Sequence, residues 1–240
     1  MKIGILSCYS NPLLPLLLND LNKFKIEKFF VILDKQDFSK NQNKLWKKRT
    51  GKNFLANLTI SDCHNPSVPF YFVDSHNSSN CITLLRKLRP AVLINGGTPR
   101  KLRPEILKLP RKGVINVHPG ILPKYRGADC VEWAVLNNDP IGNSAHLMTA
   151  DYDQGPIIKK ELVEVSATDK YQTVRKKMYI AWSALMCRAI LLVLDKDSNF
   201  AKRKYKKNNR IYSPMPQNKL NKVLNSLASG MYYRKIFGKK

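Results

Sequence analysis

The chain has 240 residues, and its 42 Lys and Arg against 17 Asp and Glu give a formal net charge of +25. A hydrophobic content of 43%, with three Trp and nine Phe, is typical of one globular domain with a small appendage and excludes a disordered chain. No stretch approaches the roughly 20 apolar residues that a membrane helix needs, and the amino terminus lacks an export signal, so we expect no membrane insertion and a cytoplasmic location.

The five cysteines are widely spaced and form no Cys-x-x-Cys pair. The spacing therefore predicts neither a zinc site nor a disulfide framework, and Cys63 followed by His64 is an isolated pair in a polar segment. We expect the chemistry of this protein to require no metal.

The positive charge is unevenly distributed. After Asp197 the chain has twelve Lys and Arg and no acidic residue, and a second basic group runs from Arg86 to Lys112. Such a distribution favours polyanions or phosphate-bearing substrates. A Lys- and Asn-rich composition on solvated surfaces explains it equally well, so charge alone leaves the partner open.

Short apolar runs alternate with helical stretches in the first half of the chain. In chain order, strands are predicted over Lys2–Leu6, Phe29–Leu33, Pro69–Val73, Ala91–Asn95 and Gly113–Val117, and helices over Leu13–Leu21, Asn80–Leu88 and Lys101–Leu109. Continuous apolar strands separated by helices are typical of a parallel sheet that is covered on both faces. The sequence therefore predicts an α/β fold with a doubly wound, mainly parallel sheet.

The second half changes this rhythm. A helix is predicted over Asp129–Asn138, two strands over Asn143–Met148 and Ile157–Val165 with a tight turn at Asp151–Gly155 between them, and a long helix over Tyr171–Leu194. From Asp195 onward the composition becomes basic and polar, with one helical stretch over Leu220–Leu227. We therefore divide the chain into a main domain, residues 1–196, and a short basic carboxyl-terminal extension, residues 197–240.

Three predicted strands end in small and polar residues, at Ser7–Asn11, Asn95–Thr98 and Asn116–Gly120. In open parallel sheets, ligands bind outside the carboxyl ends of the strands, so these three ends predict a single site. The first strand is not followed by Gly-x-Gly-x-x-Gly, which disfavours a dinucleotide-dependent dehydrogenase.

Asn116 and His118 are two residues apart at the end of a strand, so their side chains point to the same side. An amide donor beside an imidazole can stabilise a developing oxyanion and move a proton, and Asp153 lies in a turn from which its carboxylate can reach the imidazole. Taken singly, a histidine after a buried strand is often structural and an acid in a turn is often ordinary, so both readings stay open. The other three histidines are predicted to lie outside this cluster, with His146 as a structural or surface residue within a strand.

The combination of motifs is more specific than its parts. The stretch Ile115–Gly127 contains Asn-x-His-Pro and Leu-Pro-x-x-Arg-Gly, and Asp153-Gln154-Gly155 begins 35 residues after His118. This set resembles the folate-dependent formyltransferase family, which includes glycinamide ribonucleotide, methionyl-tRNA and sugar N-formyltransferases. The resemblance is clear from about Ala91 to Ile158, with Gly120 where Ser is common and Gln154 where Gly or Thr often stands.

The resemblance implies a Rossmann-like formyltransferase fold and 10-formyltetrahydrofolate as co-substrate. It implies that Asn116 stabilises the tetrahedral oxyanion, that His118 moves protons between the attacking amine and the folate nitrogen, and that Asp153 tunes His118. It also implies that the pterin ring is held by a loop and an opposite wall that include Gly97, Thr98, Pro99, Arg100, Leu102 and Met148.

The amine acceptor is less well defined. Glycinamide ribonucleotide enzymes bind phosphate with a Gly-Ser-Asn loop, whereas Ser7–Pro12 here lacks the glycines. Methionyl-tRNA enzymes add a β-rich carboxyl-terminal domain, for which this chain has no room. By elimination we expect a small, anionic acceptor such as an amino-sugar nucleotide, anchored by Lys124 and Arg126.

Alternatives of two classes stay open. The first is an enzyme of the same family with another acceptor, namely a methionyl-tRNA or glycinamide ribonucleotide formyltransferase, or a formyl-folate hydrolase. The second is a protein on the same fold that binds nucleic acid or a phospholipid surface, with the basic extension on phosphates. The sequence leaves the oligomeric state open.

Overall fold

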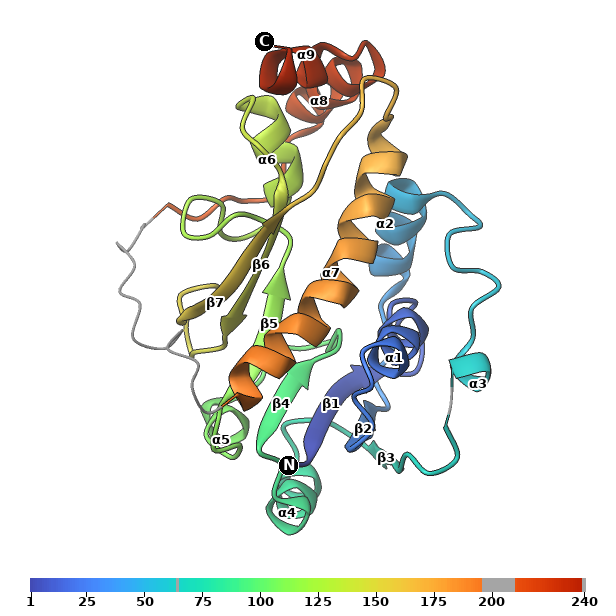
Figure 1. The fold of residues 1–240 in the computed structure, drawn as a ribbon, viewed down its shortest axis with the longest axis vertical. Helices are drawn as coiled ribbons and strands as arrows, with labels where there is room; N and C mark the ends of the chain where they lie inside the picture. The colour runs from blue at the N-terminus through green and yellow to red at the C-terminus, as the bar shows by residue number, and fades with distance from the viewer. Residues whose placement is uncertain (64, 196–209, 239–240) are drawn as a thin grey trace.

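The computed structural model describes residues 1–63, 65–195 and 210–238 (Figure 1). Within them, seven strands form one sheet in the order β3-β2-β1-β4-β5-β6-β7. The five parallel strands are β1 (Ile3–Cys8), β2 (Phe29–Asp34), β3 (Phe70–Val73), β4 (Val92–Asn95) and β5 (Val114–His118). The last two strands, β6 (Gly142–Leu147) and β7 (Ile157–Leu162), pair antiparallel on the edge beside β5. The predicted mainly parallel α/β sheet is therefore confirmed.

Helices complete the fold. Those in the described residues are α1 (Leu14–Lys23), α2 (Lys40–Thr50), α3 (Ile60–Cys63), α4 (Ser79–Leu88), α5 (Pro104–Leu107), α6 (Cys130–Leu136), α7 (Tyr171–Leu194), α8 (Gln217–Ala228) and α9 (Met231–Phe237). The predicted helix over Lys101–Leu109 is shorter, because it begins only at Pro104, whose fixed φ suits a first helical turn. The helices α2, α3 and α9 were not predicted.

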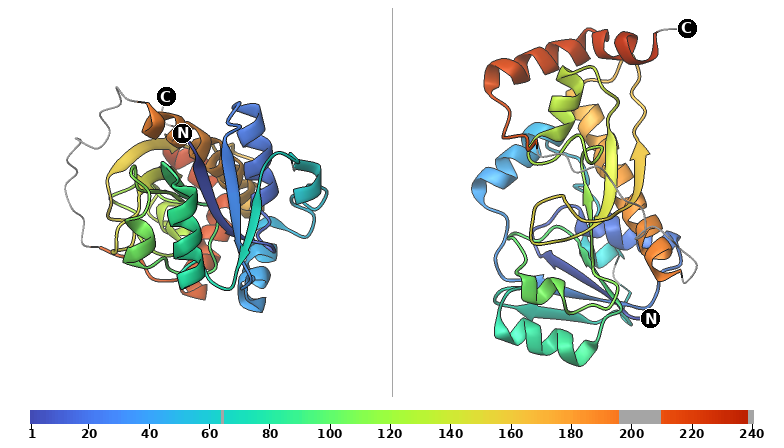
Figure 2. Two further views of the ribbon diagram at one scale, coloured as in Figure 1. Left: turned by 90° about the horizontal axis from the view of Figure 1, so that it is seen from below. Right: turned by 90° about the vertical axis from the view of Figure 1, so that its left-hand side faces the viewer.

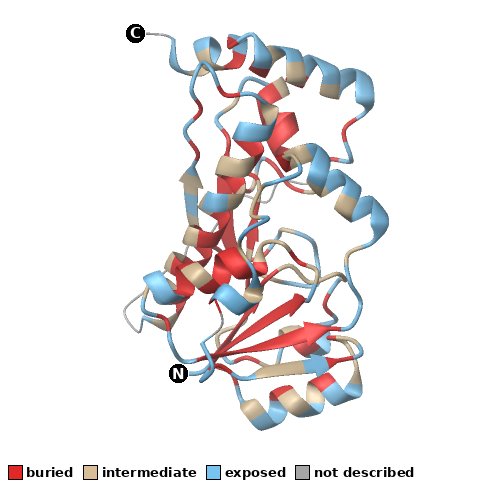
Figure 3. Ribbon diagram, turned by 90° about the vertical axis from the view of Figure 1, so that its right-hand side faces the viewer, coloured by how far each residue is buried: buried red, intermediate tan, exposed pale blue. Residues whose placement is uncertain are grey.

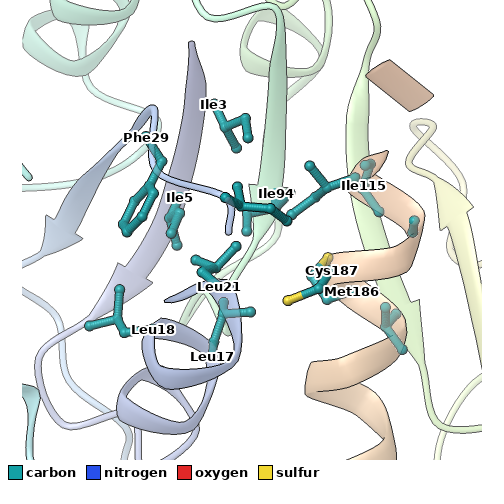
Figure 4. Packing of buried hydrophobic residues seen from close by; sticks show 14 of the residues in the cluster. Ile3, Ile5, Leu17, Leu18, Leu21, Phe29, Ile94, Ile115, Met186 and Cys187 are labelled. Atoms are coloured by element: carbon teal, nitrogen blue, oxygen red, sulfur yellow. The ribbon is translucent and has the colours of Figure 1, made fainter. Parts of the chain in front are cut away.

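The central strands are apolar on both faces because both faces are covered. Along β1, Ile3 and Ile5 join the core under α1 and α7, whereas Leu6 joins the core under α4 and α5. This alternation follows from the two-residue period of a strand, and it explains the continuous apolar runs in the sequence. Figure 4 shows the first of these clusters, and Figure 3 shows the central strands as buried elements.

The helix α7 is long and apolar enough to span a membrane by length and composition alone, so the expectation that no stretch approaches this length was wrong. In the fold it lies across the sheet (Figure 1), and its buried residues include Trp182, Leu185 and Met186 in the core with β1, β4 and β5. Core packing accounts for its apolar side.

The described part of the carboxyl-terminal extension packs on the main domain. Tyr212 pairs with Gly127, and its ring lies 5.3 Å from that of Tyr125 and 5.2 Å from that of Trp133. Figures 1 and 2 show α8 and α9 beside α6 at one end of the molecule, where Val223, among other residues, joins the same core cluster. The boundary predicted at residues 196/197 lies outside the described residues. The same holds for the basic run 198–210, which we predict to be exposed and mobile, except for Arg210.

Candidate active site

The carboxyl ends of β4 and β5 and the turn after β6 enclose a cavity of about 340 Å³. Its walls are formed by Asn95, Thr98, Pro99, Arg100, Lys101, Leu102, Asn116, His146, Met148, Thr149, Asp151, Tyr152 and Asp153. Most residues predicted for the catalytic set and the pterin site therefore line one space. Gly97 and His118 from that set do not line the cavity, and neither do the two acceptor candidates, Lys124 and Arg126.

Asn116 is oriented by the loop that follows β4. Asn95 Oδ1 accepts hydrogen bonds from the backbone N–H groups of Gly97 (3.2 Å) and Thr98 (2.9 Å). The Asn95 amide nitrogen is left to donate to Asn116 Oδ1 at 3.1 Å, and the Asn116 amide nitrogen lies on the side of His146. Asn95 was not predicted as a site residue, although it ends a strand at the edge where the site was expected.

Asp153 is held at the turn between β6 and β7 with a left-handed backbone, φ +53°. The turn requires Gly155, because a Cβ there would overlap the Leu147 carbonyl oxygen. Asp153 Oδ2 accepts a hydrogen bond from the Gly127 backbone N–H (3.2 Å) and lies 3.4 Å from His118 Nδ1. The predicted approach of the Asp153 carboxylate to the His118 imidazole is therefore present.

His118 is buried and is not among the residues that line the cavity. Its Nε2 lies 2.9 Å from the Tyr125 carbonyl oxygen, which can only accept, so Nε2 donates. Gly120 makes this placement possible, because a Cβ there would stand 2.8 Å from His118 Nε2 and 2.8 Å from the Tyr125 oxygen. The glycine in the motif Asn-x-His-Pro-Gly thus leaves room for the imidazole.

Burial and mutual contact shift the pKa values of His118 and Asp153. Desolvation lowers the pKa of His118 below its usual value, and the Asp153 carboxylate partly opposes that shift. Burial alone would raise the pKa of Asp153, but His146, His118 and the Gly127 N–H together hold it below the usual value. The carboxylate form of Asp153 is thereby favoured.

His146 belongs to this cluster, and the prediction that placed it outside was wrong. In the antiparallel pair of β5 and β6, His146 is directly opposite Asn116, so the two side chains share a face of the sheet. His146 Nε2 lies 3.1 Å from the Asn116 amide nitrogen and 3.6 Å from Asp153 Oδ1. The alternation of side chains along one strand does not show which residue of the neighbouring strand lies opposite a given position.

The predicted pterin loop, residues 97–102, is held in place by contacts with Asp34 of β2 and with Asn11. Arg100 donates to Asp34 Oδ1 at 2.8 Å, which joins the loop to the end of β2. Gly97 has φ +93°, and a Cβ there would overlap the Asn11 side chain. Leu102 and Met148 supply apolar surface on the cavity side of the core under α4 and α5.

Neither acceptor candidate lines the cavity. The Lys124 ammonium is 2.6 Å from Asp139 Oδ2 and mostly exposed. Arg126 is buried and donates to the Tyr152 carbonyl oxygen at 3.0 Å. Lys101, which was not predicted for this role, does line the cavity, with its ammonium 4.5 Å from the centre of the Tyr152 ring.

Over residues 1–63, 65–195 and 210–238, no group of three His, Cys, Asp or Glu side chains is arranged to hold a metal ion. All five cysteines are buried free thiols.

The fold is similar to that of solved structures of formyltransferases. The chain matches a sugar N-formyltransferase from a Shewanella species with a TM-score of 0.57 and 19% identity, covering 88% of this chain and 74% of that one. It matches a phosphoribosylglycinamide formyltransferase from Bacillus halodurans with a TM-score of 0.58 and 19% identity, covering 85% of this chain and 100% of that one. At such identity these matches show the fold alone.

Sequence comparison is more specific. The chain is 27% identical over 165 residues to a methionyl-tRNA formyltransferase from Thermodesulfovibrio yellowstonii, covering 68% of this chain and 51% of the relative. It is 35% identical over 133 residues to the protein of the same name from Halothermothrix orenii, covering 55% and 42%. The chain thus spans about half the length of these curated relatives. A sequence profile described as formyl transferase matches residues 1–190. This protein belongs to the formyl transferase family.

Proposed function

We propose that this protein transfers the formyl group of 10-formyltetrahydrofolate to a primary amine on a small anionic acceptor. The observation that carries the proposal is that Asn116 and Asp153 line the same cavity as Thr98 to Leu102, the loop proposed to hold the pterin. A ring bound against that loop has its formyl-bearing end beside the polar side chains at the ends of β5 and β6.

The reaction needs an oxyanion donor and a route for one proton. The amine nitrogen attacks the formyl carbon, the new C–N bond forms as the bond to the folate N10 breaks, and one proton passes from the amine to N10. The Asn116 amide is proposed to donate to the oxygen that gains charge, and His118 with Asp153 to supply the proton transfer. Each such contribution is worth about 10²–10⁴ in rate.

The residues around the cavity suit a flat, polar heterocycle. We propose that backbone groups of the loop after β4 bind the edge of the heterocycle, and Leu102 and Met148, which line the cavity, offer apolar contact. Arg100 and Lys101 on the same wall favour an anionic group, either the glutamate of the folate or the acceptor.

Methionyl-tRNA is the second candidate acceptor, because the sequence relatives carry that name and the net charge of +25 suits a polyanion. The test is incubation of the full chain with 10-formyltetrahydrofolate and, separately, amino-sugar nucleotides, glycinamide ribonucleotide, methionyl-tRNA or no amine. Product masses identify the acceptor, and release of formate without an amine would indicate hydrolysis. The variant Asp153→Asn is the inactive control.

A further inference from the structure

We propose that this protein has a second ligand site, a cavity between α4 and α5 that binds a small anion with a phosphate or diphosphate group, of the size of a nucleotide. The site is separate from the proposed formyl transfer, and its test does not depend on turnover. It gives a role to the basic group from Arg86 to Lys112, of which the candidate active site uses only Arg100 and Lys101.

The fold brings two distant parts of this basic group around one space. One part is the end of α4, and the other is the segment that joins α5 to β5. They enclose a cavity of about 490 Å³. Its lining consists of three guanidinium side chains and three apolar ones, namely Arg86, Arg89, Arg111, Leu85, Pro90 and Leu109.

This cavity lies at the other end of the strands from the candidate active site. Pro90 leads into β4 and Arg111 leads into β5, whereas the active-site cavity lies at the carboxyl ends of the same two strands. Because β5 is five residues long, it spans about 13 Å between the two ends. Figures 1 and 2 show α4 and α5 at the end of the molecule opposite α8 and α9. A small ligand in one cavity therefore leaves the other open.

The three guanidinium groups of the cavity are available to an anion. All three side chains are exposed, and in the part of the chain that the structure describes they take part in no hydrogen bond or ion pair. Arg49 and Arg188, by contrast, each pair with a carboxylate. Within the described residues, no Asp or Glu lines the cavity. Like charges gathered around one space repel each other, and a bound anion relieves that repulsion.

The choice of Arg over Lys argues against a basic surface that results from composition alone. The chain has 30 Lys and only 12 Arg, yet the three basic residues that line this cavity are all Arg. A guanidinium can donate two parallel hydrogen bonds to a pair of phosphate oxygens, which an ammonium cannot do. The neighbouring Lys112 is used elsewhere, because its ammonium donates to the Val193 carbonyl oxygen at 2.8 Å.

Arg89 is held in a backbone conformation that favours glycine. It ends α4 with φ +50° and ψ +58°, and its N–H donates to the Leu85 carbonyl oxygen. A left-handed residue after a helix is usually Gly, because a Cβ is strained there. The helix dipole favours cations at this end, but Arg86 and Lys87 in the last turn already supply them. An arginine at this strained position therefore indicates that its side chain is used.

The shape of the site favours a small molecule over a nucleic-acid strand. Its volume falls in the range of about 300–1,000 Å³ that is usual for small-ligand pockets. A strand would instead need basic side chains in a row along a groove, whereas these three surround one space. The phosphate is expected to pair with the guanidinium groups. The apolar side chains, and the flat faces of the guanidinium groups, then contact the rest of the ligand.

The test is calorimetric titration of the full chain with ADP at constant ionic strength. We expect one ADP per chain and, in the variant Arg86→Gln/Arg89→Gln/Arg111→Gln, an affinity at least about tenfold lower, because charged hydrogen bonds are lost. The control Lys40→Gln/Lys44→Gln/Lys47→Gln removes the same charge from exposed positions of α2 and should stay within about twofold of wild type. Thermal unfolding shows that each variant is folded.

Two further measurements locate the bound ADP. Saturating 5-formyltetrahydrofolate should leave the ADP affinity unchanged, because the folate is proposed to occupy the other cavity. The variant Arg89→Gly should unfold at a higher urea concentration than wild type, since the strain is relieved, and yet bind ADP more weakly.

Several results would overturn the proposal. They are the absence of saturable ADP binding, displacement of ADP by the folate, and an equal loss of affinity in the two triple variants. Binding of single-stranded RNA without binding of ADP, lost in the arginine variant, would make this surface a nucleic-acid site instead. Wild-type protein that binds ADP as expected but formylates no amine would refute the proposed function and leave this site in place.

Discussion

Asn116 on β5 lies directly opposite His146 on β6, and the two side chains meet at 3.1 Å on the face of the sheet that borders the cavity. The antiparallel β6 thus adds a second imidazole to an edge that the parallel strands alone would leave with one. Since Asp153 follows in the turn after β6, the same edge strand delivers the carboxylate that joins both imidazoles.

Replacement of His118 by Ala should reduce turnover at least about 100-fold while folate affinity stays within about tenfold. The ring does not line the cavity, so its loss removes no contact with the folate, but it frees Asp153. Binding of a folate analogue by calorimetry and single-turnover rates measure the two effects separately. Loss of binding with turnover preserved would place the pocket elsewhere.

Replacement of Gly155 by Ala should destabilise the fold strongly, by more than about 2 kcal/mol, because the added Cβ overlaps the Leu147 carbonyl oxygen of β6. Gly51→Ala is the matched control. There φ is +78° but the Cβ meets only the flexible Gln172 side chain at 3.3 Å, so the cost should be about 1 kcal/mol. Urea unfolding measures both. Equal losses would show that overlap at residue 155 is relieved by movement of the turn.

Sequence patterns predicted the strands well because burial on both faces forces continuous apolar runs. The helix α2 was not predicted because it is polar, with only Thr50 buried, although Ser39 and Gln42 form the capping box that marks its start. The position of His146 in the site was not predicted because it depends on how β5 pairs with β6, which neither strand shows by itself. A register shift beside Ala145 and His146 also breaks the alternation along β6. The tertiary contacts of a segment depend on the segment it packs against, so they could not be predicted from its own sequence.

Stability should fall in acid, and part of the slope should come from His118. Its pKa in the folded state lies below the ordinary 6.5, so the unfolded chain takes up this proton first as pH falls. The stability is fully present above the unfolded pKa and is lost as pH falls below it, by at most about 1.4 kcal/mol per pH unit. Asp153, whose pKa lies below 3.8, acts in the same sense at lower pH.

The check is urea unfolding of wild type and His118→Gln between about pH 7 and pH 5, where the variant should show a shallower slope. His76 is also buried with a lowered pKa, and its contribution is common to both proteins and cancels in the difference. Identical slopes would show that His118 is protonated equally in the folded and unfolded chains.

Tyr212 should stabilise the main domain from the carboxyl-terminal extension. Its side chain is 5% exposed and stacks on Tyr125, whose carbonyl oxygen accepts from His118. Tyr212→Ala should cost about 3–4 kcal/mol, whereas Ile211→Ala, at a residue 61% exposed, should cost less than about 0.5 kcal/mol. Chemical denaturation compares the two variants. A cost for Tyr212→Ala as small as the control would mean that this packing is dispensable.

Neutralising the basic run 198–210 distinguishes the two candidate acceptors. Truncation after Asp197 is a poor test, because it also removes Tyr212 and α8 from the core. Substitution by Gln at Lys202, Arg203, Lys204, Lys206 and Lys207 removes the charge and leaves that packing in place.

If these side chains hold a nucleic acid through about five phosphates, the logarithm of the binding affinity should fall with the logarithm of the salt concentration, with a slope on the order of −4. The substitutions should make that slope shallower. For the small acceptor that we propose, kcat/KM should change by less than about twofold, because neither step of the chemistry uses these charges. Tight, salt-sensitive binding of tRNA by the wild type, lost in the substituted protein, would reverse the assignment of the acceptor while leaving the cavity and its catalytic residues in place.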